Sequence, residues 1–289
     1  MQYKLLAVDI DGTLVNSQDK LTEPTREALR RAAAAGMRVV LATGRRYRRS
    51  RPLVVSLGID APLVTASGTL VKNPADHRTL YKAEFEHKHI VSASRLMARL
   101  GFQPIWFIDR DGVGPQDESY FEFFCTCPEV LSGENGGPDL GLYIASNGQF
   151  GRVWPNLIEE PPTDIYTGFT MGSFEQMTEL ARALEEESPG IYHTHVIRSP
   201  KYVPFLCEIS PAGATKWSAI HRLATGWGIV DEEICAVGDD VNDIAMIRAS
   251  GLGVAMDNAL PAVKEAADRI APGHDHDGLV EVVEWLLES

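Results

Sequence analysis

Acidic side chains gather in two short segments of the chain, residues 9–13 with the sequence DIDGT and residues 238–243 with the sequence GDDVND. An Asp-Gly pair by itself is common turn chemistry. Two acidic clusters, each directly after an apolar run, are harder to explain as turns alone. Carboxylates that come together repel each other unless a cation lies between them, and oxygen ligands suit a hard ion such as Mg²⁺. The two segments together predict a magnesium site.

Two further segments could bind an anion. Thr43-Gly44-Arg45 follows another apolar run, where Thr43 either caps the next helix or directs its hydroxyl and backbone N–H groups at a phosphate. Lys216 opens a predicted helix, where a solvated lysine is the ordinary interpretation. Arg45 starts an arginine-rich stretch that ends at Arg51. We interpret most of that stretch as a solvated helix face, and Arg45 as able to contact a substrate.

The elements around these segments alternate between short apolar strands and amphipathic helices. We expect strands at residues 5–8, 37–41, 63–66, 234–237, 252–256 and 269–271. This alternation indicates an α/β fold with a doubly wound parallel sheet, a Rossmann-like core with helices on both faces. The carboxyl ends of the strands in such a sheet open onto one crevice, so the acidic and anion-binding segments should converge there.

The middle of the chain differs from both ends. Gly- and Pro-rich turns separate its aromatic and β-branched segments, and only two helical patterns interrupt them. We expect residues 1–83 and 206–289 to form a catalytic core, and residues 84–205 to form an inserted α+β cap domain that determines substrate specificity.

The composition narrows the possible partners and compartments. The chain has 40 acidic and 27 basic residues among 289, a formal net charge of −13. Such a surface repels nucleic acid and anionic lipid, so we expect neither as a partner. No apolar stretch approaches the roughly 20 residues of a membrane helix, and the apolar run near the N-terminus is too short for a signal peptide. We therefore expect a cytoplasmic protein that acts away from membranes.

The four cysteines do not suggest a disulfide framework in a chain of this length. Cys125-x-Cys127 and His193-x-His195 each place two metal-binding side chains on one face of a strand, so the two pairs could hold an ion such as zinc. Buried cysteines, with histidines at the surface or facing a substrate, are the more ordinary interpretation.

The order of these segments resembles the haloacid dehalogenase superfamily, and most of all its Cof-type sugar-phosphate phosphatases. The residues that carry the resemblance are Asp9-x-Asp11-Gly12-Thr13, Thr43-Gly44-Arg45, Lys216 and Gly238-Asp239-x-x-Asn242-Asp243. The resemblance covers the predicted core and the size and placement of the cap, but not the cap sequence. The chain departs from the family at Ser67-Gly68, where Asn-Gly is frequent, and at Asp240, where many relatives have glycine.

The resemblance implies a phosphoric monoester hydrolase that uses Mg²⁺ and acts on a small phosphorylated metabolite, such as a sugar phosphate. Asp9 would be the nucleophile that forms an aspartyl-phosphate, and Asp11 the acid and then the base. The implied magnesium ligands are the Asp9 carboxylate, the Asp11 backbone carbonyl and Asp239, with support from Asp243. The implied contacts to the substrate and its phosphoryl group come from Thr43, Lys216, Gly44, Arg45 and Asn242.

Two other functions stay open on these residues alone. A phosphomutase would form the same aspartyl-phosphate but return the phosphoryl group to a bound intermediate. A phospho-acceptor or binding protein without turnover would also use grouped acids, a threonine and a lysine, although such receivers lack an inserted domain of this size.

Overall fold

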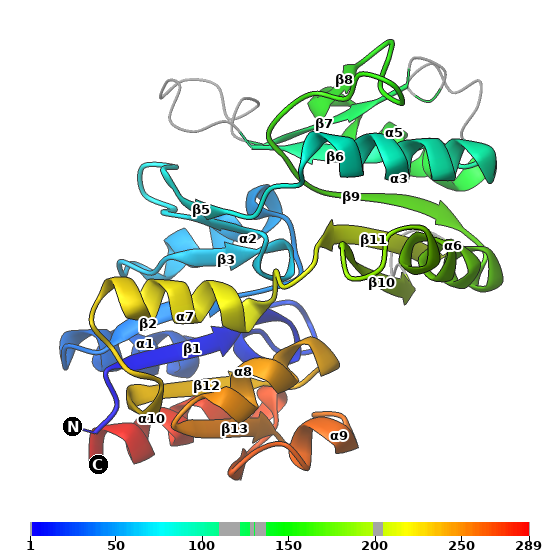
Figure 1. The fold of residues 1–289 in the computed structure, drawn as a ribbon. Coiled ribbons are helices and arrows are strands. Elements are labelled where there is room, and N and C mark those ends of the chain that lie inside the picture. The colour runs from blue at the N-terminus through cyan, green and yellow to red at the C-terminus, as the bar shows by residue number, and fades with distance from the viewer. Residues whose placement is uncertain (1, 110–121, 128–129, 131–136, 199–204, 289) are drawn as a thin grey trace. The chain divides into compact units, whose positions relative to one another are not determined.

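The computed structural model describes residues 2–109, 122–127, 130, 137–198 and 205–288 (Figure 1). The chain divides into two compact units: a core unit, which comprises Met1–Tyr81 and Thr215–Ser289, and a cap unit, which comprises Lys82–Ala214. The expected boundary after residue 205 falls at the start of strand β11 (Phe205–Pro211), which pairs with two strands of the cap unit.

The core unit is built on an eight-stranded sheet in the order β14-β13-β12-β1-β2-β3-β4-β5. Its strands are β1 (Leu5–Asp9), β2 (Arg38–Ala42), β3 (Leu63–Thr65), β4 (Leu70–Lys72), β5 (Thr79–Lys82), β12 (Ile234–Gly238), β13 (Leu252–Met256) and β14 (Arg269–Ala271). The six strands from β14 to β3 run parallel, and β4 pairs antiparallel with β3. The predicted parallel sheet is confirmed, and β4 and β5 add two strands that the sequence analysis did not predict.

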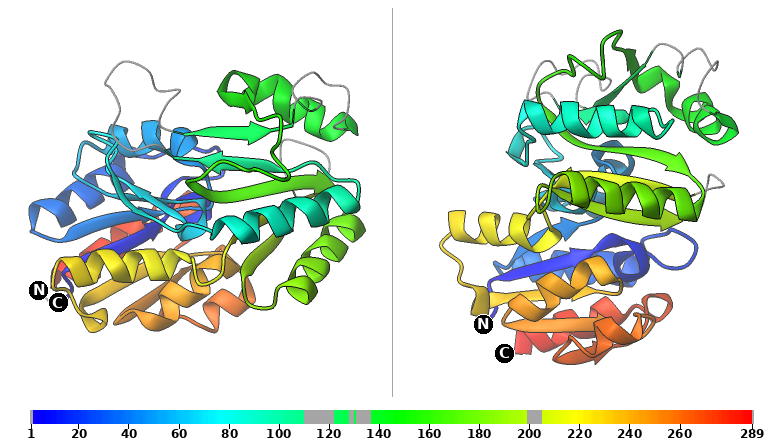
Figure 2. Two further views of the ribbon diagram at one scale, coloured as in Figure 1. Left: turned by 45° about the horizontal axis from the view of Figure 1, so that its top comes forward. Right: turned by 45° about the vertical axis from the view of Figure 1, so that its right-hand side comes forward.

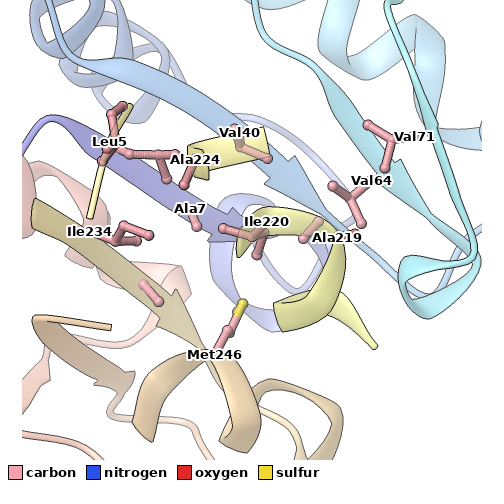
Figure 3. Close-up of a cluster of buried hydrophobic side chains, with 13 residues drawn as sticks. Leu5, Ala7, Val40, Val64, Val71, Ala219, Ile220, Ala224, Ile234 and Met246 are labelled. Carbon is pink, nitrogen blue, oxygen red and sulfur yellow. The ribbon is translucent and has the colours of Figure 1, made fainter. Parts of the chain in front are cut away.

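Helices cover both faces of this sheet (Figures 1 and 2). They are α1 (Glu23–Ala34), α2 (Tyr47–Leu57), α7 (Lys216–Gly226), α8 (Ile244–Ala249), α9 (Pro261–Lys264) and α10 (Gly278–Glu288). Ile220 of α7 and Met246 of α8 belong to a buried cluster with Ala7 and Val40 of the sheet (Figure 3). Helices α1, α2 and α10 pack against the opposite face. Each central strand is therefore buried on both sides, which explains its uniformly apolar sequence.

The cap unit contains a six-stranded sheet in the order β10-β11-β9-β6-β7-β8. Its other strands are β6 (Ile105–Ile108), β7 (Phe123–Thr126), β8 (Gly151–Val153), β9 (Ile165–Gly172) and β10 (Tyr192–Arg198), and its described helices are α3 (His87–Arg99), α5 (Gly137–Asn147) and α6 (Phe174–Glu187). All pairs are antiparallel except β7 with β8. The predicted α+β cap is confirmed, although helix α5 was not expected, because its Gly- and Pro-rich beginning indicates a turn.

Aromatic side chains contribute to the core of the cap unit. Trp106 of β6 is fully buried and donates its ring N–H to Ser94 of α3 at 3.0 Å. Tyr143 of α5 stands edge-on to Phe169 of β9, with ring centroids 5.0 Å apart. Among the described residues, no helix is both long enough and apolar enough to span a membrane.

Candidate active site

Three aspartates converge at the carboxyl end of the core sheet. Asp9 is the last residue of β1, Asp239 follows the neighbouring strand β12, and Asp243 ends the short turn after it. One carboxylate oxygen of each lies within 4.8 Å of the others. Asp9 and Asp243 are buried, and Asp239 is partly exposed. Adjacent parallel strands therefore bring the first and last parts of the chain into one acidic cluster, as predicted.

The ammonium group of Lys216 is the positive charge inside this cluster. Lys216 is the first residue of α7, and a capping box fixes where that helix begins. Its Nζ donates to Asp9 Oδ1 at 2.5 Å, to Asp243 Oδ1 at 2.7 Å and to Asn242 Oδ1 at 2.9 Å. An ammonium group has three protons, so all three are used. Only 2% of the side chain is exposed, which overturns the ordinary expectation of a solvated lysine.

Lys216 alone does not balance the charge of the cluster. Burial raises the pKa of Asp9 against the opposing effect of Lys216. Burial and the charge of Asp243 raise the pKa of Asp239 to about 7. Burial by itself would lower the pKa of Lys216, but the carboxylates that it contacts raise it overall. The ammonium group contacts two of the three carboxylates, so a further cation would relieve the repulsion between them.

The cluster also has the donor atoms that a hard divalent cation requires. Its three carboxylates offer only oxygen ligands, and Mg²⁺ binds in proteins through one or two carboxylates while it keeps waters and phosphate oxygens as further ligands. Among the described residues, no other group of three or more acidic, histidine or cysteine side chains lies close enough together to hold a metal ion. The residues present therefore fit the predicted ion.

The loop after β1 approaches Asp239 closely. Gly12 has φ +74°, and a Cβ at this position would lie 2.1 Å from an Asp239 carboxylate oxygen, so only glycine fits. Buried Thr13 donates its hydroxyl to Asp239 Oδ1 at 3.3 Å. From the other side, Asp243 Oδ2 accepts the backbone N–H groups of Asp239 and Asp240 at 3.1 Å each. The Asp240 side chain is exposed and caps the turn, which gives this departure from the family a local structural role.

The loop after β3 supports the start of α7. Gly68 has φ +106°, and a Cβ here would lie 2.0 Å from the carbonyl oxygen of Thr215, so a larger residue would displace the beginning of the helix. Gly44 lies beside the preceding residue, Ser67. A Cβ added to Gly44 would lie 3.4 Å from Ser67 Oγ and 3.8 Å from Asn242 Nδ2. Ser67, Gly44 and Asn242 are thus brought together beside Lys216.

Asp11 forms an ion pair and does not join the buried cluster through its side chain, which is 57% exposed. Arg45 donates through Nε to the two Asp11 oxygens at 2.9 and 2.8 Å, and through Nη2 to Oδ1. Thr43 Oγ1 lies 3.5 Å from Asp11 Oδ2, at the limit of a hydrogen bond, and accepts the backbone N–H of Arg45 at 3.0 Å. The predicted convergence of the two loops is therefore present at this edge of the sheet.

The rest of the arginine stretch is less solvated than expected. Arg49 is exposed, whereas Arg46, Arg48 and Arg51 are half-buried. Arg51 Nε donates to the backbone carbonyl of Pro74 at 2.9 Å. The interpretation as a solvated helix face therefore holds for Arg49 alone.

The comparison with known families decides the identity of this fold and site. A family model of haloacid dehalogenase-like hydrolases matches residues 6–283 of the chain. The chain belongs to this family. The haloacid dehalogenase resemblance drawn from the four motifs is thus confirmed, and the enzyme is a phosphatase of this family.

Individual haloacid dehalogenase-like relatives match over nearly their full length. The protein YxeH of Bacillus subtilis is 28% identical over 289 residues, which cover 99% of this chain and 98% of the relative. YcsE of the same organism, named a 5-amino-6-(5-phospho-D-ribitylamino)uracil phosphatase, is 26% identical over 291 residues and covers 99% of this chain and 97% of its own.

Solved structures show the same haloacid dehalogenase-like architecture. A hydrolase from Bacteroides thetaiotaomicron is 26% identical with a TM-score of 0.74, and the match covers 98% of this chain and 99% of that one. A subclass IIB sugar phosphatase, at 22% identity and a TM-score of 0.70 over 98% of both chains, shares the fold. Both matches extend over the core and the cap units.

The alternative zinc site of the cap does not form. Cys125 lies on β7 and the two histidines of His193–His195 lie on β10, with β6, β9 and β11 between these strands. Neighbouring strands lie about 4.8 Å apart, so the two pairs cannot share one ion. Cys125 and Cys127 are buried, as the ordinary interpretation expects.

Several residues that hold the loop after β1 were missed in the sequence analysis. Asn258 donates its side-chain amide to the Gly12 carbonyl at 2.8 Å, and Asp19 forms an ion pair with Arg45. Thr13 was named as part of the first motif, but no role was predicted for it. Asn258 and Asp19 carry no local sequence signal, because their partners are distant in the chain.

Proposed function

We propose that this phosphatase hydrolyses small phosphate monoesters with Mg²⁺ as cofactor, and that the Asp9 carboxylate attacks phosphorus to form an aspartyl-phosphate. The observation that carries the proposal is the buried contact of Lys216 with both Asp9 and Asp243, next to Asp239. The Asp9 carboxylate lies at the end of a strand and is held by an ammonium group. The three carboxylates outnumber that one positive charge, so the site can receive a cation together with a phosphate ester.

In the first step, an Asp9 oxygen bonds to phosphorus while the bond to the leaving oxygen breaks. Asp11 gives its proton to that oxygen, so the leaving group departs as a neutral alcohol. Thr43 donates a hydrogen bond to the phosphoryl oxygens, and Lys216 does the same by exchanging one of its present acceptors for a phosphoryl oxygen. These bonds stabilise the negative charge of the phosphoryl group during transfer. Gly44, Arg45 and Asn242 complete the contacts to the substrate.

In the second step, the Asp11 carboxylate takes a proton from water, and the water oxygen bonds to phosphorus. The bond between phosphorus and the Asp9 oxygen breaks, which releases inorganic phosphate and restores the Asp9 carboxylate. Because Asp11 ends this step protonated, it is ready to act as the acid in the next cycle.

The carboxylates of Asp9 and Asp239 and the Asp11 backbone carbonyl would hold the magnesium ion, with Asp243 in support. When bound, the ion would supply positive charge to the phosphoryl oxygens. The raised pKa values of Asp9 and Asp239 support this assignment, because they reflect burial together with grouped negative charge, both of which a bound cation would compensate.

The first test is release of inorganic phosphate from p-nitrophenyl phosphate in the presence of Mg²⁺, by the natural enzyme and by Asp9→Asn. We expect the variant to keep its circular dichroism spectrum and to lose turnover by at least about 10³-fold. The matched control is Asp257→Asn, which removes an exposed carboxylate paired with Lys264. Undiminished phosphate release by Asp9→Asn would refute the nucleophile, and turnover that requires a bisphosphate activator would indicate a phosphomutase.

The substrate class is proposed to be a sugar phosphate or a similar small phosphorylated metabolite. A panel of phosphorylated sugars, sugar alcohols, nucleotides and cofactors, scored by kcat/KM for phosphate release, identifies the preferred leaving group. A preference for polymeric or protein-bound phosphate over every small ester would contradict this part of the proposal.

A further inference from the structure

Arg45 is held by two carboxylates at once. Its Nε and Nη2 atoms clamp Asp11 from one side, and Nη2 also donates to Asp19 Oδ1. The Arg45 side chain is only 10% exposed, whereas those of Asp11 and Asp19 are 57% and 58% exposed. The guanidinium group is therefore the fixed member of the three, and the orientation of the Asp11 carboxylate depends on it.

A tight turn holds Asp19 in place. Asp19 has φ +58°, in the left-handed region. Its backbone N–H donates to the Asn16 carbonyl at 2.9 Å, and Asn16 Oδ1 accepts from Gln18 and Lys20 at 3.1 Å each. An aspartate tolerates the left-handed conformation better than most residues, and the Asn16 side chain stabilises the turn.

The loop that carries this turn is fastened to a distant part of the core unit. His274 Nδ1 donates to the Val15 carbonyl at 2.8 Å, and Asp275 Oδ1 accepts the backbone N–H of Ser17 at 2.8 Å. The turn that presents Asp19 is thus anchored through Val15 and Ser17, which precede Asp19 in the chain, and this limits how far Asp19 can move from Arg45.

We infer that Asp19 is a positioning residue, which holds Arg45 so that Arg45 keeps the Asp11 carboxyl group aimed at the leaving oxygen. Asp19 itself does not touch the substrate. This inference rests on the proposed function, in which Asp11 protonates the leaving group. An exposed ion pair adds little to stability, but small errors in the position of a proton donor are costly to the rate.

Two substrates with different leaving groups separate this role from a merely structural one. p-Nitrophenolate is a stable anion that leaves with little protonation, whereas the alkoxide of an alkyl phosphate requires the proton of Asp11. The quantity to compare is kcat/KM, because it reports on phosphoenzyme formation and excludes the later hydrolysis of the aspartyl-phosphate. We therefore measure p-nitrophenyl phosphate beside the best alkyl phosphate of the panel.

For Asp19→Asn we expect kcat/KM to fall about tenfold for the alkyl phosphate and less than about threefold for p-nitrophenyl phosphate. The tenfold loss is a part of the roughly 10²–10⁴-fold rate increase that a general acid contributes. Asp19→Glu restores the charge and should recover part of the loss. The control Glu23→Gln removes another exposed carboxylate that pairs with an arginine, Arg26, and should change neither value. An equal loss on both substrates, or no loss on either, overturns the inference.

Asp11→Asn serves as the reference for the same comparison. If Asp11→Asn shows the selective loss on the alkyl phosphate and Asp19→Asn does not, the inference about Asp19 fails while the proposed function stands. If Asp11→Asn shows no selectivity between the two substrates, the assignment of Asp11 as the acid fails, and the inference falls with it.

Discussion

Lys216 Nζ lies 2.5 Å from Asp9 Oδ1, although 207 positions of the chain separate the two residues. The contact exists because α7 begins where the parallel strands β1 and β12 end, and because Gly68 lets the loop after β3 lie against the first turn of that helix. Both side chains are almost completely buried. The pair therefore links the stability of the core unit to the chemistry of the site.

Replacing the lysine by methionine tests that link. Lys216→Met keeps an unbranched side chain that is one atom shorter, and it leaves Asp9 and Asp243 without their ammonium partner. Because removal of one member of a buried ion pair leaves an uncompensated charge, we expect the free energy of unfolding to fall by about 3–5 kcal/mol and phosphate release to fall by at least about 10²-fold. Urea unfolding and the phosphate assay provide the two values.

The control for this variant is Lys264→Met, which removes a partly exposed lysine paired with Asp257. It should change the free energy of unfolding by no more than about 1 kcal/mol and leave turnover intact. A Lys216→Met protein as stable and as active as the natural one would contradict the structural role of the buried contact.

Position 68 should require glycine for two reasons: its φ is positive, and a Cβ would collide with the backbone at Thr215. A Cβ in Gly68→Ala would lie 2.0 Å from the Thr215 carbonyl oxygen, whereas Gly36, which has a similarly positive φ, has no atom within 4 Å of its Cβ position. We therefore expect Gly36→Ala to cost about 1 kcal/mol of unfolding free energy and Gly68→Ala clearly more, with loss of turnover because the start of α7 shifts. Thermal unfolding followed by circular dichroism compares the two variants, and equal costs would contradict the packing at Gly68.

The stability of the metal-free enzyme should depend on pH through Asp239. Its pKa is about 7 in the folded protein and close to 3.8 in the unfolded chain, so between these values the folded protein holds a proton that the unfolded chain has lost. The free energy of unfolding in the presence of a chelator should therefore decrease as the pH rises from about 4 to about 7. Chemical unfolding at a series of pH values measures this slope.

Two comparisons isolate the contribution of Asp239 from that of other titrating groups. Asp239→Asn cannot ionise and should reduce the slope. Saturating Mg²⁺ should stabilise the natural enzyme most at pH 7 and above, because the ion binds the deprotonated carboxylates. If the slope were the same in Asp239→Asn, the charge repulsion assigned to this cluster would be wrong.

Much of the fold was predictable because its signals are local. The apolar runs of β1 and β12, the cap residue before α7 and the glycine turns between elements are each contained in a few consecutive residues. Parallel pairing then brings Asp9 and Asp239 to one edge without further information. Helix α5 was missed because glycine and proline at its start indicate a turn, and strand β11 because its pairing with β9 and β10 is a tertiary contact.

The missed parts of the site depend on partners far apart in the sequence. Asp19 is an ordinary exposed acid until the fold places it beside Arg45, and Asn258 is an ordinary loop residue until its amide reaches Gly12. The burial of Lys216 likewise follows from the packing of α7 and not from the sequence around it. Local patterns specify which elements form, whereas contacts such as these are specified by the packing of the whole core unit.

The assignment of Asp9 as the nucleophile is tested by locating the phosphoryl group on the enzyme. Enzyme mixed with a radiolabelled phosphate ester and Mg²⁺ is quenched with acid during turnover and digested, and the labelled peptide is sequenced by mass spectrometry. We predict an acid-stable, hydroxylamine-sensitive label on the peptide that contains Asp9, and none in Asp9→Asn. Label on another residue, or continued turnover by Asp9→Asn, would contradict nucleophilic attack by Asp9.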